Sequence, residues 1–123
     1  MKAFKHYNAT SVDDAISLMS SSDGRTNLIA GGTDLLGVLK DEILPDYPEA
    51  VINIKTVPGL DDVKEYKKGL TIGALTKLAD VVAHPLVRKT YPILSKAAEA
   101  VATPEIRNMA TLGGTLAHAD PTS

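Results

Sequence analysis

Two glycine pairs, each placed after an apolar stretch, constrain the fold of this chain more than any other feature of its sequence. They stand in the segments Ile29-Ala30-Gly31-Gly32-Thr33-Asp34 and Thr111-Leu112-Gly113-Gly114-Thr115. Because glycine lacks a Cβ, such a turn can adopt positive φ and present bare backbone amides to a ligand. Successive amides form a small anion-binding nest, to which a hydroxyl or a following helix adds donors. The two turns therefore predict a site for the two phosphates of one dinucleotide.

Each turn also has a purely structural interpretation. Thr33 or Asp34 would then cap a short helix, and Gly113-Gly114 would form a β-turn. The occurrence of two such turns, each followed by threonine, favours ligand binding over this alternative. Classical mononucleotide-binding and Rossmann sites are disfavoured, because the chain has neither the Gly-Lys-Ser/Thr end of a Walker loop nor a GxGxxG fingerprint.

The composition excludes several classes of ligand. A net charge of −2 over 123 residues gives no general electrostatic reason to bind nucleic acid or an anionic membrane. The absence of cysteine excludes disulfides, cysteine-ligated zinc and iron–sulfur ligation within these residues. The histidines at positions 6, 84 and 118 are too widely spaced to predict a metal site. The polar start and the lack of a long apolar run predict a soluble, cytoplasmic protein without a signal peptide or membrane helix.

The pattern along the chain predicts a mixed α+β protein of two small lobes, residues 1–57 and 58–123, with a glycine turn in each and a seam at Pro58-Gly59. For the first lobe we expect a helix that begins with the capping box Ser11-Val12-Asp13-Asp14. Its apolar face would consist of Ala15, Ile16, Leu18 and Met19. After this helix we expect a loop at 20–24, a short buried strand at 27–30, a helix at 35–40, a loop at 41–49 and a strand at 50–54.

For the second lobe we expect a hairpin of strands 63–66 and 70–74, a helix capped by Thr76 and closed by His84-Pro85, a helix at 93–102, and a strand at 115–117 after the second glycine turn. That last strand would need a partner and a continuation. We therefore expect the chain to be a fragment of a longer polypeptide.

Two groups of polar side chains near the second turn have open interpretations. Arg107 either neutralises a phosphate or pairs with Glu105 or Glu99 on the surface. His118 and Asp120 either form an acid/base pair or belong to an ordinary loop.

Three motifs occur along the chain in a characteristic order and spacing. They are Ala30-Gly31-Gly32-Thr33-Asp34-Leu35-Leu36, Ile72-Gly73-Ala74-Leu75-Thr76, and Ile106-Arg107-Asn108-Met109-Ala110-Thr111-Leu112-Gly113-Gly114. Together they resemble the FAD-binding subunit of molybdenum hydroxylases, a group that includes xanthine dehydrogenase, carbon monoxide dehydrogenase medium subunits and 4-hydroxybenzoyl-CoA reductase. The resemblance covers all 123 residues and implies a two-lobed α+β FAD-binding domain of the vanillyl-alcohol oxidase/molybdopterin dehydrogenase type, with an incomplete second lobe.

The same resemblance implies which residues contact FAD. A first loop would contain Leu28, Ile29, Ala30, Gly31, Gly32, Thr33 and Asp34, and a second would contain Thr111, Gly113, Gly114 and Thr115. The FAD diphosphate would lie across the two glycine turns. No residue of the chain would be catalytic, because the isoalloxazine transfers the electrons while the protein supplies position and electrostatics.

The chain departs from the family pattern at its C-terminal end. Thr115 stands where the family usually has asparagine, which shortens one hydrogen-bonding side chain. The segment His118-Ala119-Asp120-Pro121 resembles the ordinary hydroxylase branch and lacks the cysteines of the benzoyl-CoA reductase branch. The chain stops at Ser123, just before an aspartate that commonly helps bind FAD in the family, so we expect the fragment alone to hold FAD poorly and to be inactive.

The implied function is that of an oxidoreductase subunit that relays electrons from iron–sulfur clusters through FAD to NAD or another acceptor. Its partners would be a large molybdenum-cofactor subunit and a small 2Fe-2S subunit. The alternative is a non-enzymatic α+β module that binds a partner protein and no flavin, its glycine turns being merely structural. A third interpretation is an FAD enzyme of the wider oxidase group that acts alone.

Overall fold

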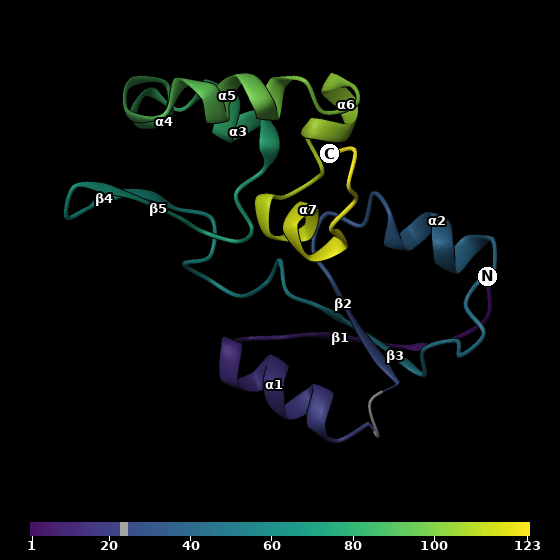
Figure 1. Cartoon of the computed structure of the whole chain (residues 1–123). Coiled ribbons are helices and arrows are strands. Elements are labelled where there is room, and N and C mark those ends of the chain that lie inside the picture. The colour runs from purple at the N-terminus through teal and green to yellow at the C-terminus, as the bar shows by residue number, and fades with distance from the viewer. Residues whose placement is uncertain (23–24) are drawn as a thin grey trace. The chain divides into compact units, whose positions relative to one another are not determined.

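The computed structural model describes residues 1–22 and 25–123, which divide into two compact units, 1–58 and 59–123 (Figure 1). The first unit contains β1 (Lys5–Asn8), α1 (Val12–Ser20), β2 (Thr26–Ile29), α2 (Leu35–Lys40) and β3 (Ala50–Asn53). The second contains β4 (Val63–Tyr66), β5 (Gly69–Ile72), α3 (Leu78–Ala83), α4 (Pro85–Thr90), α5 (Pro92–Glu99), α6 (Pro104–Arg107) and α7 (Leu112–His118). In the described ranges, no helix combines the length and the apolar character needed to cross a membrane.

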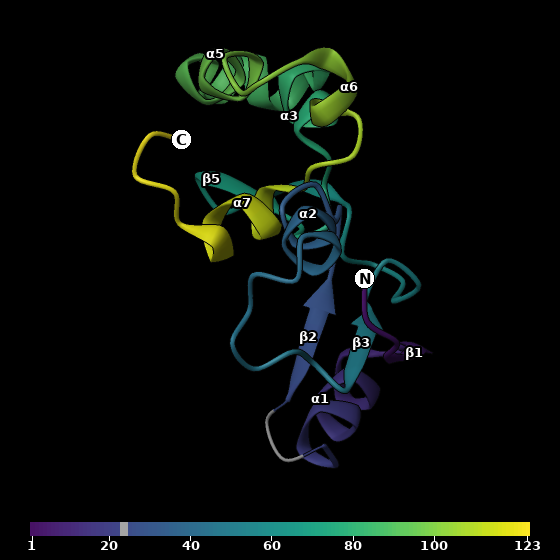
Figure 2. The same ribbon diagram turned by 90° about the vertical axis from the view of Figure 1, so that its right-hand side faces the viewer.

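A parallel sheet with the strand order β1-β3-β2 forms the centre of the first unit (Figure 2). Ile52 of the central strand lies opposite both Tyr7 of β1 and Leu28 of β2. The run from Ala50 to Ile52 is buried, as expected for a central parallel strand that is covered on both sides. All three strands run in the same direction, so their carboxyl ends meet at one edge of the sheet.

The first helix begins with a capping arrangement close to the predicted one. The Ser11 hydroxyl accepts a hydrogen bond from the Asp14 amide at 3.0 Å, and the Asp14 carboxylate accepts from the Thr10 amide at 2.8 Å. In a capping box the side chain at the third helical position accepts from the amide of the N-cap residue. Here the N-cap residue is Ser11, and Asp14 accepts instead from the amide of Thr10, one residue earlier. Ala15 is buried, whereas Ile16 is exposed, because only one stripe of α1 packs against β3. Of the loop predicted at 20–24, residues 23 and 24 lie outside the described part of the chain.

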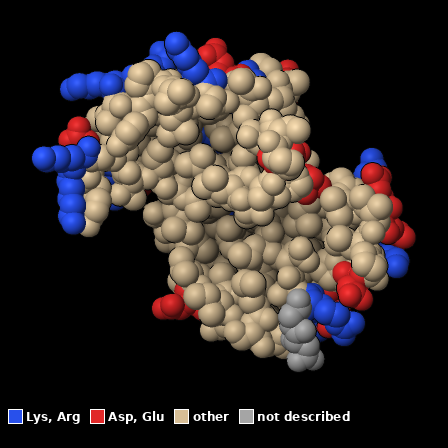
Figure 3. Space-filling view, in the orientation of Figure 1, with Lys and Arg blue, Asp and Glu red and all other residues tan. Residues whose placement is uncertain are grey.

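The second unit begins with the predicted hairpin. Strands β4 and β5 pair in antiparallel fashion with Tyr66 opposite Gly69, which leaves Lys67 and Lys68 as the loop. Lys67 has φ of +52°, a left-handed conformation that allows the tight reversal. Basic side chains gather over this end of the hairpin in Figure 3, so the loop is a charged, solvated tip.

Helices α3, α4 and α5 enclose the core of the second unit. Its fully buried members are Val81, Val87 and Ala98, and the hairpin residues Leu70 and Ile72 pack against them. Each member comes from a different short element. The core therefore forms only when these elements assemble.

The start of the first helix in this unit corrects the prediction. Thr76 was expected to cap it, but Lys77 occupies the N-cap position and Thr76 is buried one residue earlier. His84-Pro85 closes α3 as predicted and also begins α4, which the sequence did not predict. The His84 Nδ1 accepts from the Leu86 amide at 3.2 Å, and proline is well suited to the first helical position.

Residues 115–117 form a helix, where a strand was expected. The second glycine pair occupies the first turn of α7 and is not a β-turn that precedes a strand. Thr111 begins this helix, and it also forms an antiparallel bridge with Lys77, far away in the sequence. The two glycines disfavour a helix locally, so this tertiary bridge and the Thr111 cap decide the outcome.

Candidate functional site

The first glycine turn connects β2 to α2 and depends on one glycine conformation. Gly32 has φ of +78°, which L-residues with a side chain rarely adopt. A Cβ at this position would lie 3.1 Å from the side chains of Ile29 and Leu36. The first turn therefore contains the positive-φ glycine that the sequence predicted.

The amides of this turn are open for an external acceptor. Within residues 1–22 and 25–123, the N–H groups of Gly31, Gly32 and Thr33 donate to no protein acceptor. Gly31 and Gly32 are half-buried. A backbone donor without a protein partner needs water or a ligand oxygen, so consecutive open amides are suited to an anion. This arrangement fits the phosphate oxygens of a dinucleotide.

A chain of hydrogen bonds connects the carboxyl ends of the three strands to this turn. Asn53 Nδ2 donates to Asn8 Oδ1 at 2.9 Å, and the Lys55 amide donates to Asn53 Oδ1 at 3.1 Å. The Lys55 ammonium then donates to the Ala30 carbonyl at 2.7 Å. In open sheets of parallel strands, ligands bind outside the carboxyl ends of the strands. This edge of the first unit is therefore its candidate binding site.

Sequence reasoning did not single out Asn53 or Lys55. The available signal was their position, since both are polar residues at the end of an otherwise apolar strand. Polar residues at the end of a strand indicate a ligand-binding edge of the sheet only when the strands are known to be parallel. The pairing of β3 with both neighbours supplies that knowledge.

The second glycine turn has a different character, because its amides are engaged within the protein. The Gly113 amide donates to the Ala74 carbonyl at 2.8 Å, and the Gly114 amide donates to the Thr111 hydroxyl at 3.1 Å. The Thr115 amide donates to the Thr111 carbonyl at 3.0 Å. The first turn therefore offers open amides to a ligand, and the second turn does not.

Close packing explains why Gly113 carries no side chain. A Cβ there would lie 2.7 Å from both the Cβ and the carbonyl oxygen of Ala74. Contacts this short force the backbone apart. Gly113 therefore allows the start of α7 to lie directly on the segment that follows β5.

The other polar candidates near this turn have structural partners. Arg107 Nη1 donates to the carbonyls of Val101 at 2.8 Å and Ala102 at 3.4 Å, and among the described residues Arg107 forms no ion pair with Glu105 or Glu99. The Asp120 carboxylate accepts from the Thr122 amide at 2.9 Å and the Thr122 hydroxyl at 2.7 Å. These bonds, with a smaller contribution from His118, lower the pKa of Asp120. A lowered pKa makes this carboxyl a poor general acid.

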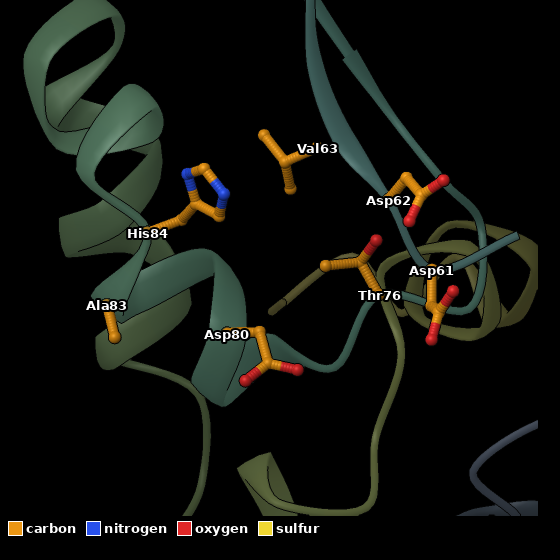
Figure 4. A pocket seen from close by; sticks show the side chains of 7 residues that line it. All are labelled: Asp61, Asp62, Val63, Thr76, Asp80, Ala83 and His84. Carbon is orange, nitrogen blue, oxygen red and sulfur yellow. The ribbon is translucent and has the colours of Figure 1, made fainter. Parts of the chain in front are cut away.

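A hollow of about 440 Å³ lies in the second unit, near the start of β4 and the end of α3 (Figure 4). It is lined by Asp61, Asp62, Val63, Thr76, Asp80, Ala83 and His84. Asp62 pairs with Lys64 at 3.3 Å, and the buried Thr76 hydroxyl has no hydrogen-bond partner among the described residues. Among all residues that the structure describes, no group of three or more histidine, cysteine, aspartate or glutamate side chains is arranged to hold a metal ion. None of the residues predicted to contact FAD lines this hollow.

The sequence matches a family model described as the FAD binding domain in molybdopterin dehydrogenase over residues 2–123. The carbon monoxide dehydrogenase medium chain of Hydrogenophaga pseudoflava is 34% identical over 118 residues, which cover 96% of this chain and 40% of that protein. The 6-hydroxypseudooxynicotine dehydrogenase complex subunit alpha of Paenarthrobacter nicotinovorans is 36% identical over 118 residues, which cover 96% of this chain and 39% of that protein.

Two solved structures share the fold. Carbon monoxide dehydrogenase from Hydrogenophaga pseudoflava, in a form that lacks the Mo-pyranopterin moiety, has a TM-score of 0.93 at 34% identity over 98% of this chain and 41% of that chain. Quinoline 2-oxidoreductase from Pseudomonas putida 86 has a TM-score of 0.93 at 33% identity over 100% of this chain and 43% of that chain. The chain thus spans about two fifths of the length of these relatives. It belongs to the family of FAD-binding domains in molybdopterin dehydrogenases.

Proposed function

We propose that this chain is part of the FAD-binding subunit of a molybdenum hydroxylase. In this role the subunit passes electrons from iron–sulfur clusters to NAD or another acceptor. Family membership supports the proposal and makes FAD the cofactor. The structural observation that carries it is the first glycine turn, where the amides of Gly31, Gly32 and Thr33 are open for an anionic ligand.

The residues proposed to contact FAD make different contributions. The open amides of the first turn would donate to phosphate oxygens, and the positive φ of Gly32 would give the turn the conformation that presents them. In the second unit, the hydroxyls of Thr111 and Thr115 and the amides of Gly113 and Gly114 have partners within the protein, so the proposed contacts there rest on the family resemblance. When bound, FAD supplies the redox chemistry, and the chain binds and orients it. The proposed contacts comprise Leu28, Ile29, Ala30, Gly31, Gly32, Thr33, Asp34, Thr111, Gly113, Gly114 and Thr115.

The proposed partners are a large molybdenum-cofactor subunit and a small 2Fe-2S subunit, and the proposed location is the cytoplasm. The relatives' names support an assembly, since they describe a "medium chain" and a "complex subunit alpha". This chain contains no cysteine, so any iron–sulfur ligands that such a pathway requires must come from outside these residues.

The first test is an absorption spectrum of the complete natural polypeptide, followed by heat release and identification of any flavin. We expect a yellow protein that releases FAD in a ratio close to one per polypeptide. A colourless, folded polypeptide whose spectrum does not change on titration with FAD would contradict the proposal. That result would favour the non-enzymatic module that binds a partner protein.

The electron acceptor requires a separate measurement on the assembled complex. After anaerobic reduction by substrate or dithionite, addition of NAD should produce NADH absorbance if NAD is the acceptor. Reoxidation by a quinone or oxygen without NADH formation would assign another acceptor. Either result leaves the FAD-binding role intact.

A further inference from the structure

The carboxyl edge of the sheet in the first unit places a cation directly behind the first glycine turn. The Lys55 ammonium lies 2.7 Å from the Ala30 carbonyl oxygen, although the two residues are 25 positions apart in the sequence. Asn53 fixes the backbone of Lys55 through its side chain, and Asn53 is itself held by Asn8. Lys55 is therefore tied to the ends of both neighbouring strands.

Among the described residues, Lys55 forms no ion pair with a carboxylate. Burial lowers the pKa of the Lys55 ammonium, and no acidic group contributes to the shift. Lys55 is an exposed residue, and an ammonium group without a carboxylate partner is available to attract an anionic ligand. The nearest open donors, the amides of the first turn, also require an acceptor. Both features are satisfied by one anionic ligand.

The geometry of the peptide group connects the two features. In a trans peptide, the carbonyl and the N–H point in opposite directions. When Lys55 holds the Ala30 carbonyl on one side, the Gly31 N–H of the same peptide must point to the other. The positive charge also polarises this peptide group, which strengthens the Gly31 N–H as a donor.

We propose that Lys55 is a positioning residue for flavin binding: it orients the Ala30–Gly31 peptide so that the Gly31 amide faces the FAD diphosphate, and it supplies positive charge behind that amide. This inference rests on the proposed function. A positioning role can be distinguished from a merely structural one by comparing ligands with and without phosphates. The orientation of the Gly31 amide and the positive charge of Lys55 both act on the diphosphate, so a flavin without phosphates should bind equally well with or without them.

The test compares FAD and riboflavin binding to the complete polypeptide, freed of flavin, by quenching of flavin fluorescence. We expect Lys55→Met to weaken FAD binding about tenfold or more, as charge-assisted hydrogen bonds make large contributions. Riboflavin binding should change less than about twofold, since that ligand carries no phosphate. The salt dependence of FAD binding should become shallower in Lys55→Met, because one positive charge is removed from the site.

Three further variants separate charge, hydrogen bonding and folding. Lys55→Arg keeps the charge and a donor, so it should retain FAD affinity within about threefold. Lys40→Met removes the same charge from an exposed position at the end of α2 and should leave FAD affinity unchanged. If Lys55→Met does not fold, Lys55→Gln replaces it; because glutamine keeps a neutral donor, we expect a smaller loss of FAD affinity that is still absent for riboflavin.

Three outcomes would overturn the inference. Equal loss of FAD and riboflavin in Lys55→Met would assign Lys55 a structural role only. Unchanged FAD affinity with unchanged salt dependence would remove Lys55 from the site and leave the proposed function standing. A folded wild-type polypeptide that binds no FAD would overturn both the inference and the proposed function.

Discussion

Gly32 gives the first glycine turn its backbone conformation. Its φ of +78° costs an L-residue with a Cβ about 1–2 kcal/mol. A methyl group would also lie 3.1 Å from Ile29 and Leu36. We therefore expect Gly32→Ala to lower the free energy of unfolding by about 1–2 kcal/mol and to reduce flavin retention. Urea denaturation and flavin content of the complete polypeptide measure the two effects.

Gly37 provides a matched control in the same unit. It lies in the middle of α2, and a Cβ there would meet no atom within 4 Å. Since alanine is the better helix former, Gly37→Ala should raise the free energy of unfolding by up to about 1 kcal/mol. If the two substitutions changed stability by the same amount and in the same direction, the conformational requirement at Gly32 would be wrong.

At the scale of the element, α7 depends on the cap supplied by Thr111. The Thr111 hydroxyl accepts from the Gly114 amide, and the residue is 3% exposed. We expect Thr111→Val to lower the melting temperature, with a loss of about 1 kcal/mol in unfolding free energy, because the Gly114 amide loses its acceptor. Differential scanning calorimetry of the complete polypeptide measures the change.

Thr111→Ser is the control for this helix, since serine keeps the hydroxyl and loses only a methyl group. We expect Thr111→Ser to preserve the helix, which circular dichroism can follow. A Thr111→Val protein as stable as wild type would show that the cap contributes nothing.

At the scale of the whole molecule, stability depends on the apolar side chains that are buried on folding. Leu78 in the second unit is 2% exposed, whereas Ile93 of α5 is 79% exposed. We expect Leu78→Ala to cost about 2–5 kcal/mol, because it leaves a cavity where packing was dense. Ile93→Ala removes a side chain of similar size and should change stability by no more than about 0.5 kcal/mol. Urea denaturation compares them, and equal losses would contradict the assignment of the core.

Local signals determined much of the fold before any tertiary information. The helix at 35–40 was predicted with its observed bounds, and the hairpin from residue 63 onward was predicted from its turn. The order of three motifs indicated the family and its cofactor, and the family match confirms both. The helix and the hairpin depend on residues that are neighbours in the sequence, where capping, turn chemistry and propensity act directly.

Only the tertiary structure decided the features that depend on distant contacts. The sequence predicted β2 and β3 of the first unit, but neither β1 nor the parallel pairing, and hence not the edge where Lys55 meets Ala30. It predicted a strand where the Thr111 cap and the bridge to Lys77 favour helix α7. A hydrogen bond between residues far apart in the sequence leaves no local pattern. Its partners are fixed only when packing brings their strands and helices together.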